Sequence, residues 1–157
     1  MTNIGIVEAR WPQDHDRVLA LFRAYIDELG IDLSFQGVDQ EFVSLPGKYA
    51  RPNGLVLLAR AAEGDVVGTV AYRSFGPGAC KMKRLYITPL WRRHGIGRLL
   101  CVRLLDDARA AGYRRMLLDT GDWLVAALAL YRALGFTEVT AYYHNPISGT
   151  VYMARDL

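Results

Sequence analysis

The sequence has 157 residues, a length that suits one domain built around a single core. Hydrophobic residues make up 52% and charged residues 22%, as in ordinary globular proteins, and the net charge of +3 is too small to indicate nucleic-acid binding by itself. No stretch approaches the ~20 apolar residues of a membrane-spanning helix, and the acidic N-terminus is unlike a signal peptide. We therefore expect a cytoplasmic protein that does not bind a membrane.

The N-terminal half of the chain predicts one helix and four strands. Residues 4–10 alternate in polarity as a strand does, and apolar residues from Val18 to Leu29 recur at helical spacing until Gly30 ends the run. Residues 31–53 are irregular, with a short helix predicted near 39–45. Residues 54–62, 66–75 and 80–88 predict strands joined by short turns, and turns this short require antiparallel neighbours.

The C-terminal half predicts a different architecture. A helix from Ile96 ends at Gly112, a strand follows at 114–120, and a second helix ends at Gly135. The strand at 80–88, the helix and the strand at 114–120 form a βαβ unit with parallel strands. Residues 136–143 and 150–157 predict a closing hairpin. We expect one α/β domain over residues 1–157, with a mixed sheet and helices on its faces.

The stretch "WRRHGIGRLL", residues 91–100, predicts a phosphate-binding site. The first turn of a helix presents amides without intrahelical partners and carries partial positive charge. Gly95 and Gly97 allow an anion to approach the main chain, and Arg92, Arg93 and Arg98 add charge. The alternative is a loop glycine pair with solvated arginines. The nucleotide P-loop string is absent, and Leu100 stands where a dinucleotide fingerprint needs glycine.

Three strings in this order resemble the GNAT family of N-acetyltransferases. "RRHGIG" is similar to the family's R/Q-x-x-G-x-G/A signature, "MKRLYI" to the strand before it, and "ALYRALGF" to a second recurrent string. "YYHNP" followed by "VYMARDL" is similar to one bacterial branch. The resemblance covers residues 4–157 and implies the GNAT acyl-CoA N-acyltransferase fold: antiparallel N-terminal strands, then the βαβ unit and the C-terminal hairpin.

The resemblance implies that acetyl-CoA is the co-substrate. Its pyrophosphate would lie on the main chain of residues 93–98, and its pantetheine arm would run along the strand at 85–87. The two parallel strands, 80–88 and 114–120, would splay apart to admit this arm. The implied cofactor-binding residues are Leu85, Tyr86, Ile87, Arg92, Arg93, His94, Gly95, Ile96, Gly97 and Arg98.

Acetyl transfer from a thioester to an amine needs a proton donor for the leaving thiolate and a route for the amine proton. Tyr131 lies at the family's tyrosine position and is the predicted donor, although its place on an apolar helix face also fits a core residue. Many relatives carry glutamate where this chain has Lys81, which we expect to be a solvated cation at the end of a strand. The amine proton could instead leave through water to one of three groups, Asp119, Glu138 or His144.

Several alternatives stay open. The lysine in place of glutamate would also fit a module that binds coenzyme A but catalyses little. Nucleic-acid binding is not expected at this charge, although basic residues gather around the strand and the glycine turn. They are Lys81, Lys83, Arg84, Arg92, Arg93, Arg98, Arg114 and Arg115. Dimers are common among GNAT members, so a homodimer is an open alternative.

The acceptor is predicted only as a primary amine of a small molecule or peptide. Acidic residues of the region after the first helix would suit a cationic amine, and Tyr142 and Tyr143 are candidate walls of its pocket. Those acidic residues are Asp27, Glu28, Asp32, Asp39 and Glu41. Cys80 and Cys101 are expected to be packing thiols, and the histidines and cysteines show no metal-ligand spacing, so no metal site is predicted.

Overall fold

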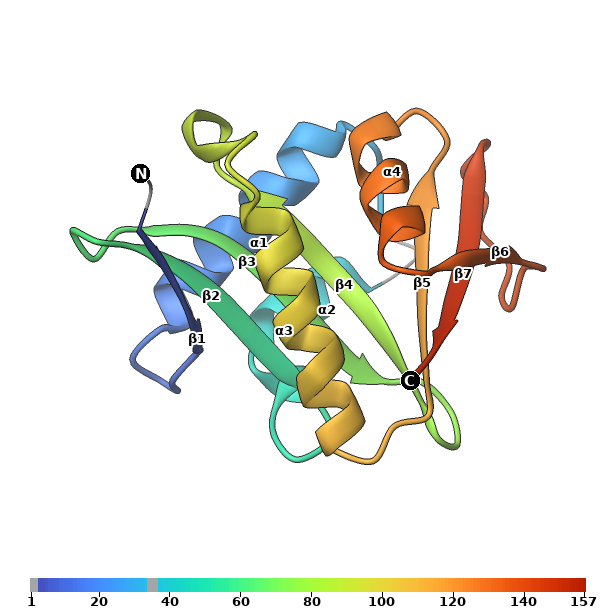
Figure 1. Cartoon of the computed structure of the whole chain (residues 1–157), viewed down its shortest axis with the longest axis horizontal. Helices are drawn as coiled ribbons and strands as arrows, with labels where there is room; N and C mark the ends of the chain where they lie inside the picture. The colour runs from blue at the N-terminus through green and yellow to red at the C-terminus, as the bar shows by residue number, and fades with distance from the viewer. Residues whose placement is uncertain (1–2, 34–36) are drawn as a thin grey trace.

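The computed structural model describes residues 3–33 and 37–157, and its centre is a seven-stranded sheet (Figure 1). The strands lie in the order β1-β2-β3-β4-β5-β7-β6. The strands are β1 (Ile4–Glu8), β2 (Leu55–Ala61), β3 (Val66–Ser74), β4 (Ala79–Ile87), β5 (Arg115–Gly121), β6 (Thr137–Val139) and β7 (Thr150–Asp156). The helices are α1 (His15–Leu29), α2 (Val38–Val43), α3 (Ile96–Ala110) and α4 (Val125–Ala133).

The strand directions confirm the predicted mixed sheet. β1 to β4 are antiparallel neighbours, β4 and β5 are parallel, and β5, β7 and β6 are antiparallel again. The connection from β4 to β5 passes through α3, as a parallel crossover requires. The predicted closing hairpin is present, but β6 ends at Val139 and residues 140–149 form a loop. The expectation of a strand through Tyr143 was therefore wrong.

Helices cover both faces of the sheet. In Figure 1, α3 and α4 lie in front of the sheet, while α1 and α2 lie behind it. In the front core, Leu100 and Leu104 of α3 and Leu128 of α4 pack against strand residues that point to the front of the sheet. In the rear core, Phe22 of α1 packs with strand residues that point to the rear. Side chains of a strand alternate between faces, so β2, β3 and β4 supply residues to both cores. No helix in residues 3–33 and 37–157 is long and apolar enough to cross a bilayer.

The parallel strands separate soon after they begin. β4 and β5 pair only from Ala79 to Lys81 on β4 and from Arg115 to Leu117 on β5. Beyond Lys81 the two strands diverge, while β5 stays paired with β7 as far as Gly121. The predicted splay is therefore present, and it begins at Met82. We call the opening between the two strands the fork.

A β-bulge lies on β4 beside the fork. Ala71 of β3 pairs with Lys83 and Thr69 pairs with Tyr86, so two residues of β4 stand opposite one residue of β3. Arg84 takes up the extra length with a φ of 63°, a left-handed conformation that costs a non-glycine residue energy. Because of the bulge, the side chains of Lys83 and Arg84 both lie on the rear face of the sheet, whereas neighbours in a regular strand point to opposite faces.

Candidate active site

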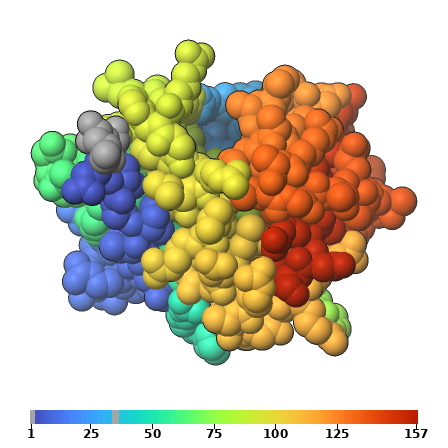
Figure 2. Space-filling view, in the orientation of Figure 1, coloured from blue at the N-terminus to red at the C-terminus, as the bar shows by residue number. Residues whose placement is uncertain are grey.

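A cavity of about 750 Å³ passes through the fork. Its walls come from the end of α1, from β4, from the loop and first turn of α3, from β5, from α4 and from the loop before β7. In Figure 2 the blue surface of α1 is visible at the bottom of the gap between the yellow loop before α3 and the orange α4. The cavity therefore joins the front face of the sheet to the rear face.

One end of the cavity is lined by free main-chain amides. Leu99 donates the first backbone hydrogen bond of α3, to the Gly95 carbonyl at 3.2 Å. In the described part of the chain, the backbone amides of residues 93–98 donate no hydrogen bond. Arg93 and Gly95 have φ values of 67° and 75°, which turn this run of amides outward. Such an array with a helix N-terminus behind it is suited to a phosphate group.

The two glycines of this turn have different roles. Gly95 needs its positive φ, which an L-residue adopts only with strain. Gly97 has an ordinary helical conformation, and a Cβ there would meet only the Leu130 side chain, at 3.4 Å. The space in front of Gly95 is open, and at Gly97 only the end of the Leu130 side chain is near.

The three arginines of the turn are not equivalent. Arg92 is held by Glu28 of α1 in a bidentate ion pair with N–O distances of 2.7 and 2.6 Å, and it also donates to the Ile87 carbonyl. Arg93 and Arg98 are exposed and form no ion pair within residues 3–33 and 37–157. Arg92 thus fixes the turn to α1, while Arg93 and Arg98 remain available to an anion.

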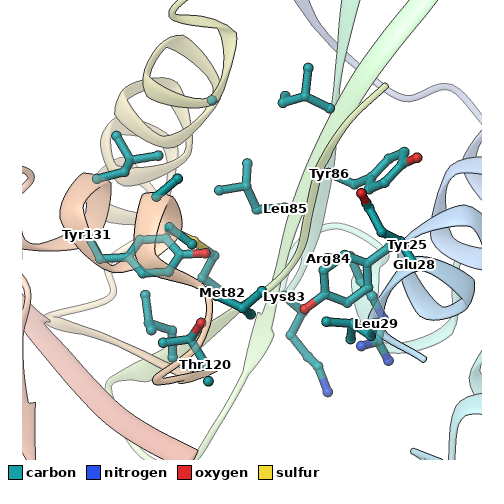
Figure 3. A pocket seen from close by; sticks show the side chains of 18 of the residues that line it. Tyr25, Glu28, Leu29, Met82, Lys83, Arg84, Leu85, Tyr86, Thr120 and Tyr131 are labelled. Atoms are coloured by element: carbon teal, nitrogen blue, oxygen red, sulfur yellow. The ribbon is translucent and has the colours of Figure 1, made fainter. Parts of the chain in front are cut away.

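Tyr131 reaches the middle of the cavity from α4. Its ring packs against Phe136 on the core side, and in Figure 3 its hydroxyl points toward β4. Among the described residues the hydroxyl has no hydrogen-bond partner. Burial raises the pKa of this phenol well above its ordinary value, so it keeps its proton at neutral pH. The residue is therefore a core residue that also lines the cavity with a protonated hydroxyl.

Lys81 is not a solvated strand-end cation, and that expectation was wrong. The residue is 6% exposed, and its ammonium group pairs with Asp119 of β5 at 2.5 Å. The rings of Tyr143, Phe75 and Tyr142 surround the ammonium at 4.4, 5.4 and 5.6 Å. Burial lowers the Lys81 pKa, and Asp119 opposes that shift. The lysine is thus buried behind Asp119, which lines the cavity.

The loop before β7 supports this ion pair. Tyr143 donates a hydrogen bond to Asp119 at 2.7 Å, and Asn145 donates to the Tyr143 hydroxyl at 3.0 Å. Tyr142 and Tyr143 do not line the cavity, so their predicted role as walls was wrong, whereas Asn145 and Ile147 of the same loop do line it. The two tyrosines instead contact the Lys81–Asp119 ion pair: both rings lie beside the Lys81 ammonium, and Tyr143 also donates to Asp119.

Sequence reasoning noted Lys83 only as one of several basic residues, yet it lines the cavity directly. It is partly buried on β4, and within the described ranges it forms no ion pair. Burial, followed by the positive charges of Arg84 and Lys81, lowers its pKa to about 7. The "KMKR" run contained a signal, because residues 81 and 83 share one face of a strand.

The acidic residues predicted to attract a cationic amine are partly used by the protein itself. Glu41 of α2 receives a bidentate pair from Arg84 at 3.0 and 3.1 Å and a hydrogen bond from Tyr49 at 2.9 Å. Glu28 is occupied by Arg92. Neither carboxylate is left to attract a cation.

Of the three candidate proton acceptors, only Asp119 lines the cavity. Glu138 is exposed on β6 near Arg132, and His144 is not among the lining residues. Cys80 and Cys101 are buried, as predicted, and burial raises both thiol pKa values to about 12. Neither thiol is a nucleophile at neutral pH.

Comparisons with known proteins agree with this geometry. The sequence model described as the Acetyltransferase (GNAT) family matches residues 19–136. An uncharacterised N-acetyltransferase of Schizosaccharomyces pombe is 42% identical, over 99% of this chain and 96% of the relative. An acetyltransferase of the GNAT family from Staphylococcus aureus has a TM-score of 0.81 at 17% identity, covering 98% of this chain and 99% of that one.

A second solved structure is the PaiA N-acetyltransferase of Thermoplasma acidophilum in complex with coenzyme A. Its TM-score is 0.74 at 14% identity, with 99% of both chains covered, so the likeness is one of fold. The family match spans most of this chain, and the fungal relative spans nearly all of it. The chain therefore belongs to the GNAT family and is an N-acetyltransferase.

Proposed function

We propose that the protein transfers the acetyl group of acetyl-CoA to a primary amine by direct attack of the amine on the thioester. The free amides of residues 93–98 carry this proposal. Their fit to a diphosphate is supported by the open space in front of Gly95 and by the exposed side chains of Arg93 and Arg98, which form no ion pair among the described residues. Coenzyme A, when bound, supplies the activated acetyl thioester.

The fork provides the path for the remainder of the coenzyme. Beyond Lys81, one edge of β4 has no partner strand among the described residues, so an extended chain can lie along residues 85–87 and add to the sheet. Leu85, Tyr86 and Ile87 all line the cavity there. The predicted cofactor residues that line the cavity are Leu85, Tyr86, Ile87, Arg92, Arg93, Gly95, Ile96, Gly97 and Arg98, whereas His94 does not.

Tyr131 donates a proton to the leaving thiolate in this proposal. Its hydroxyl lies on the cavity wall on the same face as α3, the face from which the coenzyme would enter. The amine approaches from the opposite face, where Lys83 and Asp119 line the fork. The positive charge near Lys83 favours the neutral form of an incoming amine, which reduces the need for a strong base. After the C–N bond forms and the C–S bond breaks, the nitrogen loses its proton to solvent, and Tyr131 regains a proton from solvent.

A thiol-release assay tests the proposal. Purified protein with acetyl-CoA and a panel of primary amines should release coenzyme A only when an amine is present, and calorimetry should detect uptake of coenzyme A without an amine. Absence of coenzyme A uptake would overturn the proposal. Saturable uptake with no turnover on a broad panel would instead indicate a binding module.

A further inference from the structure

Two lysines on β4 differ in whether a carboxylate pairs with them, and the proposed reaction does not explain this difference. Lys81 and Lys83 face the same side of the sheet, because they pair with Arg73 and Ala71 of β3. Lys81 has Asp119 as its counter-ion, and Arg84 next to them has Glu41. Among residues 3–33 and 37–157, Lys83 has no carboxylate partner.

A partly buried ammonium without a counter-ion is costly to the fold. It is retained beside two further cations, and each of the two carboxylates close to it is already bound to one of them. Arg73 adds a further cation beside Lys81, so the local charge around the rear opening of the fork is net positive when Lys83 is protonated. This opening repels polycations and attracts anions.

The position of Lys83 ties this charge to the acceptor. Lys83 lies near the start of the fork, two residues after Lys81, the last residue of β4 that pairs with β5, and it lines the cavity. Figure 3 shows it with Met82 on the strand that runs between Tyr131 and Tyr25. The phosphate-binding amides lie beyond the other end of β4, so Lys83 is remote from the coenzyme's diphosphate and close to the point where transfer would occur.

We propose that the acceptor in this reaction is a primary amine that also carries a carboxylate, and that Lys83 binds this carboxylate at the rear opening of the fork. The inference rests on the proposed function and specifies its substrate class. The carboxylate supplies the counter-ion that the fold does not provide. The same contact sets the distance between the carboxylate and the attacking nitrogen, so amino acids fit better than amines of opposite charge.

The test compares amino acids with their own carboxamides. The common L-amino acids, the carboxamide of each one that is acetylated, and spermidine as a cationic probe are assayed for acetyl-CoA-dependent thiol release. We expect the wild type to favour an amino acid over its carboxamide by about 10- to 100-fold in kcat/KM, the range expected for one hydrogen-bonded charge contact. Equal rates, or a preference for spermidine, would overturn the inference.

Variants of Lys83 separate binding from other roles. Lys83→Met should raise the KM for amino acids by about tenfold or more and remove the preference over carboxamides, and Lys83→Arg should keep part of the preference. Lys48→Met is the matched control, because Lys48 is exposed and the substitution is the same; this variant should behave as wild type. A fall in kcat on carboxamides as well would identify Lys83 as a proton acceptor and would overturn the inference.

Coenzyme A binding distinguishes this inference from the function on which it depends. Calorimetry with coenzyme A alone should give the same affinity for wild type and Lys83→Met, which also shows that the variant folds. If coenzyme A binds and neutral amines react without any carboxylate preference, the inference fails and the proposed function stands. If coenzyme A does not bind, both fail.

Discussion

The two ends of the cavity present positive charge in different ways. At the α3 end it comes from main-chain amides and depends on backbone conformation at Arg93 and Gly95. At the fork it comes from the Lys83 side chain, and a single substitution can remove it. A backbone site suits a ligand that all members of a family share, whereas a side-chain site can vary between members. Under the two proposals, the amide end would bind the coenzyme and the Lys83 end would select the acceptor.

The largest expected effect tests the wall of the fork. Asp119→Ala removes the counter-ion of buried Lys81 and the acceptor of the Tyr143 hydrogen bond. Loss of one partner of a buried pair should lower the free energy of unfolding by about 3–5 kcal/mol. Denaturant unfolding measures this, with Asp106→Ala, which removes an exposed ion pair to Arg109, as the control. A change below about 1 kcal/mol would mean that the pair is not a structural part of the wall.

Tyr131→Phe tests the chemistry between the two ends. It removes the hydroxyl and leaves the packing against Phe136, so kcat should fall by roughly 100-fold with little change in coenzyme A affinity. Tyr113→Phe, which loses a hydroxyl bonded to the Asn53 carbonyl far from the fork, should keep full kcat. Steady-state kinetics and calorimetry together measure both quantities, and an unchanged kcat for Tyr131→Phe would remove the proton-donor assignment.

Gly97→Ala tests the amide end alone. The new Cβ meets only the end of the Leu130 side chain, at 3.4 Å, and adds a methyl group within the run of free amides, so coenzyme A affinity should fall by about tenfold through loss of about one charged hydrogen bond. Helix propensity favours alanine by roughly 1 kcal/mol, so stability should not decrease. Gly5→Ala on β1, where a Cβ meets nothing within 4 Å, is the control. Unchanged affinity in Gly97→Ala would place the diphosphate elsewhere.

The smallest expected effect concerns stability at the fork. Lys83→Met removes a charge that has no counter-ion, so the free energy of unfolding should rise by roughly 1–2 kcal/mol at pH 6. This gain in stability would accompany the loss of amino-acid preference, as when a site is retained for function rather than for the fold. A loss of stability would show that Lys83 has a structural partner.

The same variant makes a prediction about pH. The unfolded chain holds the Lys83 proton up to its ordinary pKa of 10.5, whereas the folded chain releases it near 7 under the influence of burial, Arg84 and Lys81, opposed by Glu41 and Asp119. Between these pH values the unfolded state binds more protons, so wild-type stability rises with pH through this group. The advantage of Lys83→Met should therefore be greatest below pH 7 and shrink toward pH 10.5, as unfolding at several pH values would measure.

The fold could be predicted from the sequence because its signals are local. Short turns at 63–65 and 76–78 fixed antiparallel neighbours, and helix patterns after β4 and β5 fixed the crossover. The glycine turn at 95–97 has the positive φ at Gly95 that its sequence suggested, whereas its role as a phosphate site stays a prediction. Acetyl-CoA, the acceptor and a dimer remain predictions.

The errors arose where a residue's state depends on a distant partner. Lys81 is buried against Asp119 and Tyr143, which come from other elements, and no local sequence pattern predicts these contacts. Glu41 and Glu28 looked available because their arginine partners are 43 and 64 residues away. The bulge at Arg84 also changed which neighbours share a face, and no glycine marked it.

The short pairing between β4 and β5 has a mechanical consequence. Only three residue pairs form the seam that joins the β5–β7–β6 side of the sheet to the rest. A molecule seated in the fork touches both sides, so it acts as a brace across that seam as well as a reactant. Amide hydrogens of β5 and β4 near the seam should then exchange more slowly when coenzyme A is present, so hydrogen exchange would report binding in the fork as a loss of local motion.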